Sequence, residues 1–587
     1  MKIKYLLAAS VVSLSTAGLM AVPAAAQQIT SGIEGTVSDE SGSPLSGATV
    51  VVTDTRTGAQ RSISAGESGQ FRAESLTTGG PYTVTATAPG YEGQTLENVS
   101  INLQGNTTLG FTLTSGASEN VIVVTGARVA ISQLAIGPGQ SFGAAELGTF
   151  PTLTRDIRDF IRIDPRVSLD RSGSNDRVSC LGGNDRANSF SVDGIIQSDV
   201  YGLNGTPFAS RNSLPLPFDV IAETSVEFAP YDVEYSAFTG CAINVVTKAG
   251  QNQFHGSAFF TYSDSGLQGD KFADTDLTID PFNEKRYGAT LSGPIIPDHL
   301  FFSFGYEEAK LGSSQVTGPI GSGFGTELKF VTEAQFNNVS DIVRQNFGIE
   351  SGGVTRSLPE SNRRFFGRLD WVINDQHRFE TTYQRLDETK VSSDDVSTSS
   401  RTYSGNNTFY NSGTKSNYYS ARLYSNWTDN FSTEIRASRS EVQDLQDPVG
   451  GGEAQSGNPI PRIVVGVTNP DNGESGSLVF GPGFSRAAND LKTEINQFKV
   501  KADLEAGDHK LTLGGELNQT KVFNLFVQNA TGTFTFANVA DLQAGLLACG
   551  SNTFPNANQI QDGNDLATCL AVNSRGQAGT NAAAGFY

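Results

Sequence analysis

The chain has 587 residues, which is too long for one ordinary domain, so at least three folding units are expected. Only 37% of the residues are hydrophobic, glycine occurs 64 times and methionine twice, a composition that argues against a helical bundle. The formal net charge of −20 argues against a nucleic-acid partner, because neutralising phosphates requires an excess of lysine and arginine.

Residues 1–26 have the pattern of a secretory signal peptide. A positively charged start precedes an apolar run from Tyr5 to Val22, and three alanines at 24–26 supply the small residues for cleavage before Gln27. A membrane anchor is the alternative, but the run is short and mixed for a span of about 20 apolar residues. No later segment approaches a transmembrane helix, so we expect any membrane role to be carried by β-strands.

The cysteines suggest disulfides rather than a metal site. Cys180, Cys241, Cys549 and Cys569 form no CxxC pair, and an oxidising export route makes disulfides reasonable. By segment, we expect Cys180 to pair with Cys241 and Cys549 with Cys569, with free buried thiols as the alternative. We expect no metal ion and no cofactor; in the HRFE segment, residues 377–380, side chains three apart on a strand diverge.

Residues 27–115 predict a small β-sandwich. Short alternating strands follow one another at close intervals as GIEGTVSD, GATVVVTD, GQFRAESL, PYTVTATAPGY and NTTLGFTLT. The runs GTVSDESGSPLSGATV and APGYEG resemble the carboxypeptidase regulatory-like domain. That resemblance implies a non-catalytic accessory unit, here on the periplasmic side, and no histidine precedes His255 to bind zinc.

Residues 116–128 form a linker that contains one strongly β-prone stretch. Its residues are Val121, Ile122, Val123, Val124, Thr125 and Gly126, and the residues before it offer no core to pack against. We therefore expect a strand without a sheet, which can complete the sheet of another protein. A linker that happens to contain valines, or an edge strand of the preceding domain, is the alternative.

Residues 129–250 combine one helix-like piece, Arg155 to Pro165, with short strands. SFSVDGI, from Ser189 to Ile195, predicts a strand that enters an Asp-Gly turn. GQSFG, from Gly139 to Gly143, fits a hydrolase nucleophile elbow, but glycine and proline precede it instead of a strand. We therefore expect no enzyme.

The same segment resembles the plug of TonB-dependent outer-membrane receptors, in particular the Oar-like group. The matching positions, in chain order, are Asp164-Pro165, Asn188, Asp193, Gly194, Tyr231, Asp232, Phe238-Thr239, Gly240, Asn244, Val245-Val246, Thr247 and Lys248. The resemblance implies that residues 121–126 are the TonB box, the strand to which the inner-membrane protein TonB binds in such receptors. It also implies no catalytic residue.

Residues 251–587 alternate with a period of two. Phe365, Gly367, Leu369 and Trp371 share one strand face, and Arg364, Arg368 and Asp370 occupy the other, as suits a wall between lipid and water. Very short turns occur at residues 295–299, 374–376, 428–430 and 506–508, and long polar stretches lie between them at 309–362, 388–416 and 441–493. Short periplasmic turns and long outer loops are typical of an outer-membrane barrel.

About nine strands are recognisable, starting near Phe254, whereas plugged transporters close with about 22. We therefore expect a mainly β protein: a sandwich, an α+β plug and an open set of antiparallel transmembrane strands, with the chain as given being a fragment. The resemblance implies active transport of an unidentified extracellular ligand across outer-membrane lipid, energised through TonB. A surface adhesin, or a protein of secretion or matrix organisation, is the alternative.

Overall fold

The computed structural model describes residues 29–547, apart from residues 104, 117–121, 125–138, 151, 153, 171–176, 200, 204–205, 207, 230–233, 235–237, 277–281, 507–508 and 546. The expected signal peptide, Cys549 and Cys569 lie outside the described residues. The described residues are mainly β-strands, which confirms the predicted fold class. None of the helices in this part of the chain has the length and hydrophobicity needed to cross a membrane.

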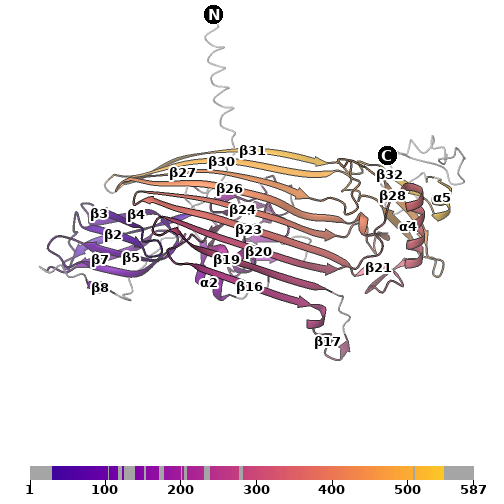
Figure 1. Cartoon of the computed structure of the whole chain (residues 1–587), viewed down its shortest axis with the longest axis horizontal. Helices are drawn as coiled ribbons and strands as arrows, with labels where there is room; N and C mark the ends of the chain where they lie inside the picture. Colours follow the sequence, from indigo (N-terminus) through magenta and orange to yellow (C-terminus); the bar gives the residue numbers. More distant parts are fainter. Residues whose placement is uncertain are drawn as a thin grey trace, which may run out of the picture.

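The N-terminal unit is a β-sandwich at one end of the molecule (Figure 1). One sheet has the order β4-β1-β7 and the other the order β3-β2-β5-β6-β8. The strands are β1 (Thr30–Asp39), β2 (Thr49–Asp54), β3 (Gln60–Ser64), β4 (Gln70–Thr77), β5 (Gly79–Thr87), β6 (Gln94–Ile101), β7 (Thr107–Leu113) and β8 (Ile122–Val124). Alternate side chains of both sheets meet in one core, where the rings of Phe71 and Phe111 lie 5.8 Å apart.

The middle unit, which we name the plug segment, contains a five-stranded sheet of order β13-β12-β15-β14-β9. Its elements are β9 (Gly139–Gly143), α2 (Ala144–Thr149), α3 (Arg158–Ile161), β10 (Val167–Asp170), β11 (Arg177–Cys180), β12 (Ser189–Val192), β13 (Ile195–Ile196), β14 (Ile221–Glu227) and β15 (Ala242–Thr247). The helix-like pattern around residues 155–165 gives the single turn α3, whose apolar residues Phe160 and Ile161 are fully buried. The segment has its own apolar core, so it is a folded unit.

Nine long strands form the third unit, a continuous antiparallel sheet among the described residues, which we name the wall. They are β16 (His255–Asp264), β19 (Asn283–Ile296), β20 (Leu300–Ser314), β23 (Ser357–Asn374), β24 (His377–Ser392), β26 (Tyr410–Thr428), β27 (Phe431–Leu445), β30 (Asn489–Ala506) and β31 (His509–Phe526). Figure 1 shows them side by side, with the plug segment behind them. In the described part of the chain β16 and β31 are not paired with each other, so the sheet is open, as predicted.

The two faces of this sheet differ as the alternation predicts. On β23, Leu369 and Trp371 are 42% and 47% exposed on the outer face, whereas Arg368 and Asp370 are buried on the inner face. On β31, Leu517 is 68% exposed. An apolar outer face and a charged inner face suit contact with lipid on one side and with the plug segment on the other.

Three of the four short turns are found where they are predicted, between β19 and β20, β23 and β24, and β26 and β27. The fourth falls on residues 507–508, outside the described residues, and Ala506 and His509 on either side of it are paired. The three described turns lie at the end of the sheet that faces the sandwich (Figure 1). The long connections lie at the other end. A small hairpin of β17 (Lys271–Phe272) and β18 (Thr275–Asp276) belongs to the first of them.

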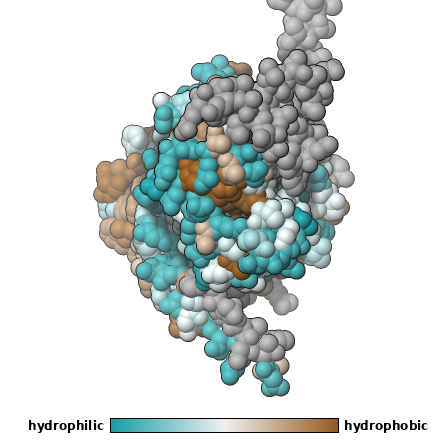
Figure 2. Space-filling model, turned by 90° about the vertical axis from the view of Figure 1, so that its right-hand side faces the viewer, coloured by the Kyte–Doolittle hydropathy of each residue, from teal (hydrophilic) through white to brown (hydrophobic). Residues whose placement is uncertain are grey.

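The long connections, which the sequence indicates only as polar loops, fold together into a compact unit that we name the loop cap (residues 315–356, 393–409, 446–488 and 527–545). Its elements are β21 (Thr317–Ile320), β22 (Thr326–Thr332), α4 (Glu333–Phe347), β25 (Thr402–Ser404), β28 (Arg462–Thr468), β29 (Ser475–Phe480), β32 (Thr533–Phe536) and α5 (Val539–Ala544). Helix α4 begins with a capping box between Thr332 and Gln335 and ends at Gly348, whose φ is +70°. Viewed from this end, the surface is largely hydrophilic, with apolar residues inside a central hollow (Figure 2).

We expect the loop cap to face the medium and the short turns to face the periplasm, since they lie at opposite ends of the sheet. A membrane-impermeant thiol reagent should label Ser475→Cys on intact cells, and Asp298→Cys only after lysis. Ser340 and Ser400, which also lie in the loop cap, provide further positions, and the unmodified chain gives the background. Labelling in the reverse order would contradict this topology.

Candidate functional site

Most of the plug residues singled out from the sequence lie in or beside the parallel pair β12 and β15. The Asn188 side chain donates to the carbonyl oxygen of Val178 over 2.7 Å and accepts from the N–H of Cys241 over 3.0 Å. Gly240 lies so close to Asn188 that an added Cβ would be 2.2 Å from its Oδ1, so only glycine fits. The Asn244 side chain accepts from the hydroxyl of Ser191 over 2.8 Å. These residues therefore shape the plug segment itself.

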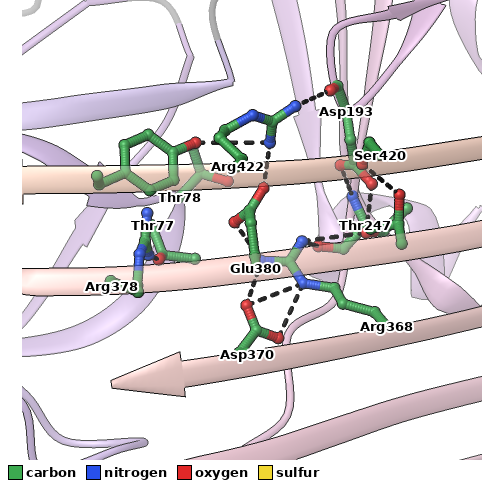
Figure 3. Close-up of polar contacts among 12 residues, drawn as sticks. Thr77, Thr78, Asp193, Thr247, Arg368, Asp370, Arg378, Glu380, Ser420 and Arg422 are labelled. Carbon is green, nitrogen blue, oxygen red and sulfur yellow. Dashed lines mark hydrogen bonds and ion pairs between the residues drawn. The ribbon is translucent and has the colours of Figure 1, made fainter. Parts of the chain in front are cut away.

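The Asp193-Gly194 turn carries the plug sheet to the inner face of the nine-stranded sheet. Both residues have positive φ, 47° and 68°, as a two-residue hairpin of this type requires. The Asp193 carboxylate accepts from the N–H and the hydroxyl of Thr247, over 2.9 and 2.7 Å. Its main-chain oxygen accepts from the guanidinium of Arg422 on β26, and Arg368 on β23 donates to Thr247 (Figure 3). The turn thus contacts β26 directly, and its partner Thr247 contacts β23.

Six ionisable residues form a continuous row across the inner face at this level. Each is the direct cross-strand partner of the next, in the order Asp370, Glu380, Arg422, Arg436, Lys499 and Glu516. Glu380 receives hydrogen bonds from both Arg368 and Arg422, and its side chain is almost fully buried (Figure 3). Buried charges are costly unless paired. The plug segment supplies partners to this row, because the main-chain oxygen of Asp193 accepts from Arg422 and the carboxylate of Glu234 pairs with Lys499.

A second set of contacts lies nearer the loop cap. The carboxylate of Glu388 on β24 accepts from the main-chain N–H groups of Arg211, Asn212 and Ser213, over 2.8, 3.1 and 2.8 Å, and from the Ser213 hydroxyl over 2.7 Å. Arg211 also forms a two-bond ion pair with Asp444 on β27. Here the wall supplies acceptors that satisfy the main chain of a plug loop.

A third contact joins the plug segment to β30. The carboxylate of Glu234 lies 2.8 Å from the Lys499 ammonium and 2.5 Å from the Lys501 ammonium. Burial alone would raise its pKa, but the two lysines outweigh burial and hold the pKa of Glu234 at about 2. Two other plug positions expected from the sequence, Tyr231 and Asp232, lie outside the described residues. The last expected position, Lys248, donates to the main-chain oxygen of Asp219 over 2.8 Å.

Cys180 and Cys241 are joined by a disulfide, with their Cα atoms 5.9 Å apart. Cys180 ends β11, and Cys241 stands immediately before β15. The bond therefore ties the irregular part of the plug segment to its central sheet, beside Asn188 and Gly240.

Strand β9 forms the edge of the plug sheet and pairs with β14 over five residues. Glu223 of β14 accepts from the hydroxyl of Ser141 on β9 and from the N–H of Leu103 in the sandwich. Burial raises the pKa of Glu223, and it raises the pKa of Glu227, at the other end of the pair, to about 7. Ser141, the candidate nucleophile of the GQSFG match, is therefore a strand residue that bonds a carboxylate, and no nucleophile elbow forms.

The β-prone stretch at residues 121–126 is partly described, as β8. Ile122, Val123 and Val124 pair in parallel with Gln94, Thr95 and Leu96 of β6. The expectation of a strand without a sheet is therefore wrong, because β6 presents a free edge that accepts an extended segment; the alternative of an edge strand describes these residues. Val121, Thr125 and Gly126 lie outside the described residues.

The sandwich itself is attached to the short-turn end of the nine-stranded sheet. The Asn252 side chain donates to the main-chain oxygen of Thr57 over 2.9 Å, and the Lys510 ammonium donates to the Glu74 carboxylate over 2.7 Å. Arg378 on β24 donates to the Thr77 hydroxyl (Figure 3). A cavity of about 650 Å³ remains where the sandwich, the plug segment and the turns meet.

The sequence predicts only some of the wall residues of the site. Alternation placed Arg368 and Asp370 on a charged face, but their partners Glu380 and Arg422 are found only when the register of three strands is known. A row of like-spaced charges on successive predicted strands is the signal that could have located them.

We expect Glu388→Ala to destabilise the plug segment against the wall. Buried donors that lose their acceptor cost about 1–3 kcal/mol each, and four donors share this carboxylate. The measurement is the rate of limited proteolysis of the plug segment in the purified protein. Asp387→Ala is the matched control, because Asp387 is the adjacent residue of β24 and its side chain is 29% exposed. Equal rates in the two variants would contradict the role of Glu388.

Removing the disulfide through Cys180→Ser with Cys241→Ser should destabilise the plug segment by about 4 kcal/mol in the chain-entropy model, because the bond closes a loop with a sequence separation of 61. Denaturant unfolding of the double variant and of the reduced parent should give the same midpoint shift. Mass mapping of non-reduced peptides provides the covalent check, and free thiols at both positions in the exported protein would exclude the bond.

Comparison with known proteins agrees with this architecture. Residues 32–114 match the carboxypeptidase regulatory-like domain, and residues 246–319 and 329–572, more than half of the chain, match the outer membrane beta barrel domain. The TonB-dependent transporter Oar of Myxococcus xanthus is 26% identical over 305 residues, which are 49% of this chain and 28% of that protein.

Among solved structures, the outer membrane transporter YddB of Escherichia coli has a TM-score of 0.48 at 12% identity, over 68% of this chain and 50% of that one. The siderophore receptor PirA of Acinetobacter baumannii has a TM-score of 0.42 at 16% identity, over 65% and 48%. The chain thus spans about half the length of these proteins, and the match covers less of Oar. The chain belongs to the outer membrane β-barrel family, with an N-terminal carboxypeptidase regulatory-like domain, and its place is the outer membrane.

Proposed function

We propose that this protein is a TonB-dependent outer-membrane transporter, in which a pull on residues 121–126 rearranges the plug segment and admits a bulky substrate. Its partners are TonB with its inner-membrane energising complex, outer-membrane lipid and an extracellular ligand. The outer membrane has no ATP, so a mechanical connection is a physically reasonable source of energy. The name of the similar protein Oar includes the same activity.

The observation that carries the proposal is the path from the β-prone stretch to the plug sheet. Fourteen undescribed residues, 125–138, separate β8 from β9, and β9 is the edge strand of the plug sheet. An edge strand has a neighbour on one side only, so a pull along the chain can detach β9 from β14 without first breaking the other pairings of the sheet. A pull on a central strand would have to break the hydrogen bonds to both of its neighbouring strands.

The chemistry of the plug–wall contacts supports the same proposal. Many contacts between the plug segment and the wall are polar, such as Glu388 with residues 211–213 and Arg422 with Asp193, and they stand beside the apolar contact of Phe366 on β23 with the plug core. Groups of this kind can exchange their partners for water when the plug segment moves. An apolar contact of equal area would oppose the movement through the hydrophobic effect.

TonB would bind β8 by adding a strand to it. The pairing with β6 uses one edge of β8 and leaves the other for a partner, or TonB displaces β6 altogether. In both cases recognition depends on the main-chain N–H groups of residues 121–126. A surface adhesin, the alternative function, needs neither these groups nor a plug.

Val123→Pro should weaken binding of the purified protein to the periplasmic domain of TonB by about tenfold or more, because proline lacks the N–H and is excluded from paired strand positions. Val129→Pro is the matched control, since Val129 lies three residues beyond Gly126.

Deletion of residues 121–126 should abolish energised uptake but leave surface labelling of the loop cap unchanged. Equal TonB binding by Val123→Pro and the parent would contradict the proposal that TonB binds residues 121–126. Uptake that survives the deletion would contradict the proposal that this contact energises transport.

A further inference from the structure

The loop cap contains a second cavity, which takes no part in the plug–wall contacts. Its volume is about 530 Å³, a size that suits a small ligand or a short peptide. It is bounded by one face of α4, by the ends of β28 and β29, and by the connection from β32 to α5. The loop cap lies at the end of the molecule farthest from the sandwich, where an external ligand arrives first (Figure 1).

The lining of this cavity is polar but carries no charge. Its members with hydrogen-bonding side chains are Gln335, Asn338, Thr468, Ser475 and Asn538, and the remaining members are glycine, alanine and valine. By contrast, the whole chain has 61 acidic and 41 basic residues. An anionic ligand would need arginine or lysine here, and a cationic ligand would need a carboxylate. The lining therefore fits an uncharged ligand rich in amide groups.

One wall of the cavity is an unfinished strand edge. Strand β28 extends to Thr468, but its parallel pairing with β32 ends at Val465 opposite Phe536. The N–H of Arg462 donates to Gly532 on the β32 side, and every second residue of a strand faces the same side. The main-chain groups of Gly466 and Thr468 therefore point to the β32 side. The register opposite Phe536 uses the N–H of Gly466. The carbonyl oxygen of Gly466 and the N–H of Thr468 therefore lie past the end of β32, next to the cavity.

The surroundings of this edge are fixed by other contacts. The Gln335 side chain donates to the main-chain oxygen of Thr468 over 2.9 Å, which holds the end of β28 against α4. The hydroxyls of Thr468 and Ser475 lie 2.9 Å apart across the hairpin. Asn538 accepts from the N–H of Asp541 over 2.9 Å and so starts α5 at the far rim. The edge and its rim are thus built before any ligand arrives.

We propose that this cavity binds a short, extended, uncharged peptide segment, which continues the sheet from the point where β32 ends. One peptide residue pairs with the carbonyl oxygen of Gly466 and the N–H of Thr468 on β28, and small side chains occupy the space above Val339 and Val467. The inference rests on the proposed function in that it names the ligand class of an outer-face receptor. Binding in the loop cap is nevertheless independent of TonB.

The test measures peptide binding to the full chain purified in detergent. The probe is acetyl-Ala-Val-Ala-Ser-amide, measured by saturation-transfer NMR. Two further probes each differ in one property: the same peptide with N-methylated amides, which cannot form a strand ladder, and acetyl-Glu-Val-Glu-Ser-amide, which is charged. Maltotriose represents a neutral carbohydrate. We expect binding of the first probe, and affinity lower by about tenfold or more for the N-methylated and the charged peptides.

Asn338→Trp fills the cavity from α4, and Asn337→Trp adds the same side chain one residue earlier, outside the lining. We expect loss of peptide binding in the first variant and parental binding in the second, with the β-sheet circular dichroism of the parent in both. Equal binding of the N-methylated probe, equal binding by the two variants, preference for maltotriose, or no binding of the first probe would each overturn the proposal. TonB binding by Asn338→Trp at the parental level separates this outcome from a failure of the transport proposal.

Discussion

The pairing of ionisable groups between the plug segment and the inner face of the nine-stranded sheet is the constraint on which the rest of the structure depends. Arg211 of the plug segment pairs with the buried Asp444, and Glu234 pairs with the buried Lys499; the free energy of burying such groups is unfavourable unless each charge has a partner. The wall therefore requires the plug segment as much as the plug segment requires the wall. The apolar outer face suits contact with lipid, because these charges lie on the inner face.

The same arrangement connects the two ends of the molecule. Glu223 accepts hydrogen bonds from the edge strand β9 and from the sandwich. The sandwich includes β8, and it is hydrogen-bonded to Lys510 and Asn252 at the short-turn end of the sheet. A displacement of the sandwich would therefore act on the hydrogen bonds of β9 before it affected the plug core. The contacts of the carboxypeptidase regulatory-like domain therefore lie between β8, where we propose that TonB binds, and the edge strand of the plug sheet.

The long connections form one folded unit, the loop cap, and are not separate loops. Loops of this length often carry recognition functions, but here all four segments of the loop cap share one apolar core around Phe336 and Ile463. A shared core holds the segments against one another and fixes the end of β28 beside α4. A site fixed in this way would lower the entropic cost of binding the proposed peptide.

The sequence by itself determined the elements that depend on local pattern: the sandwich strands, the three described short turns, the inner and outer faces of the wall, and the open sheet. A period of two, and turn residues between strands, act over a few residues, and therefore they are readable without a fold. Only the tertiary structure decided which charges meet, that β8 pairs with β6, and that the polar connections form a cap. These features depend on register between strands that are distant in sequence, such as the alignment of Glu380 with Arg422, and a one-residue shift would turn every one of those side chains to the other face.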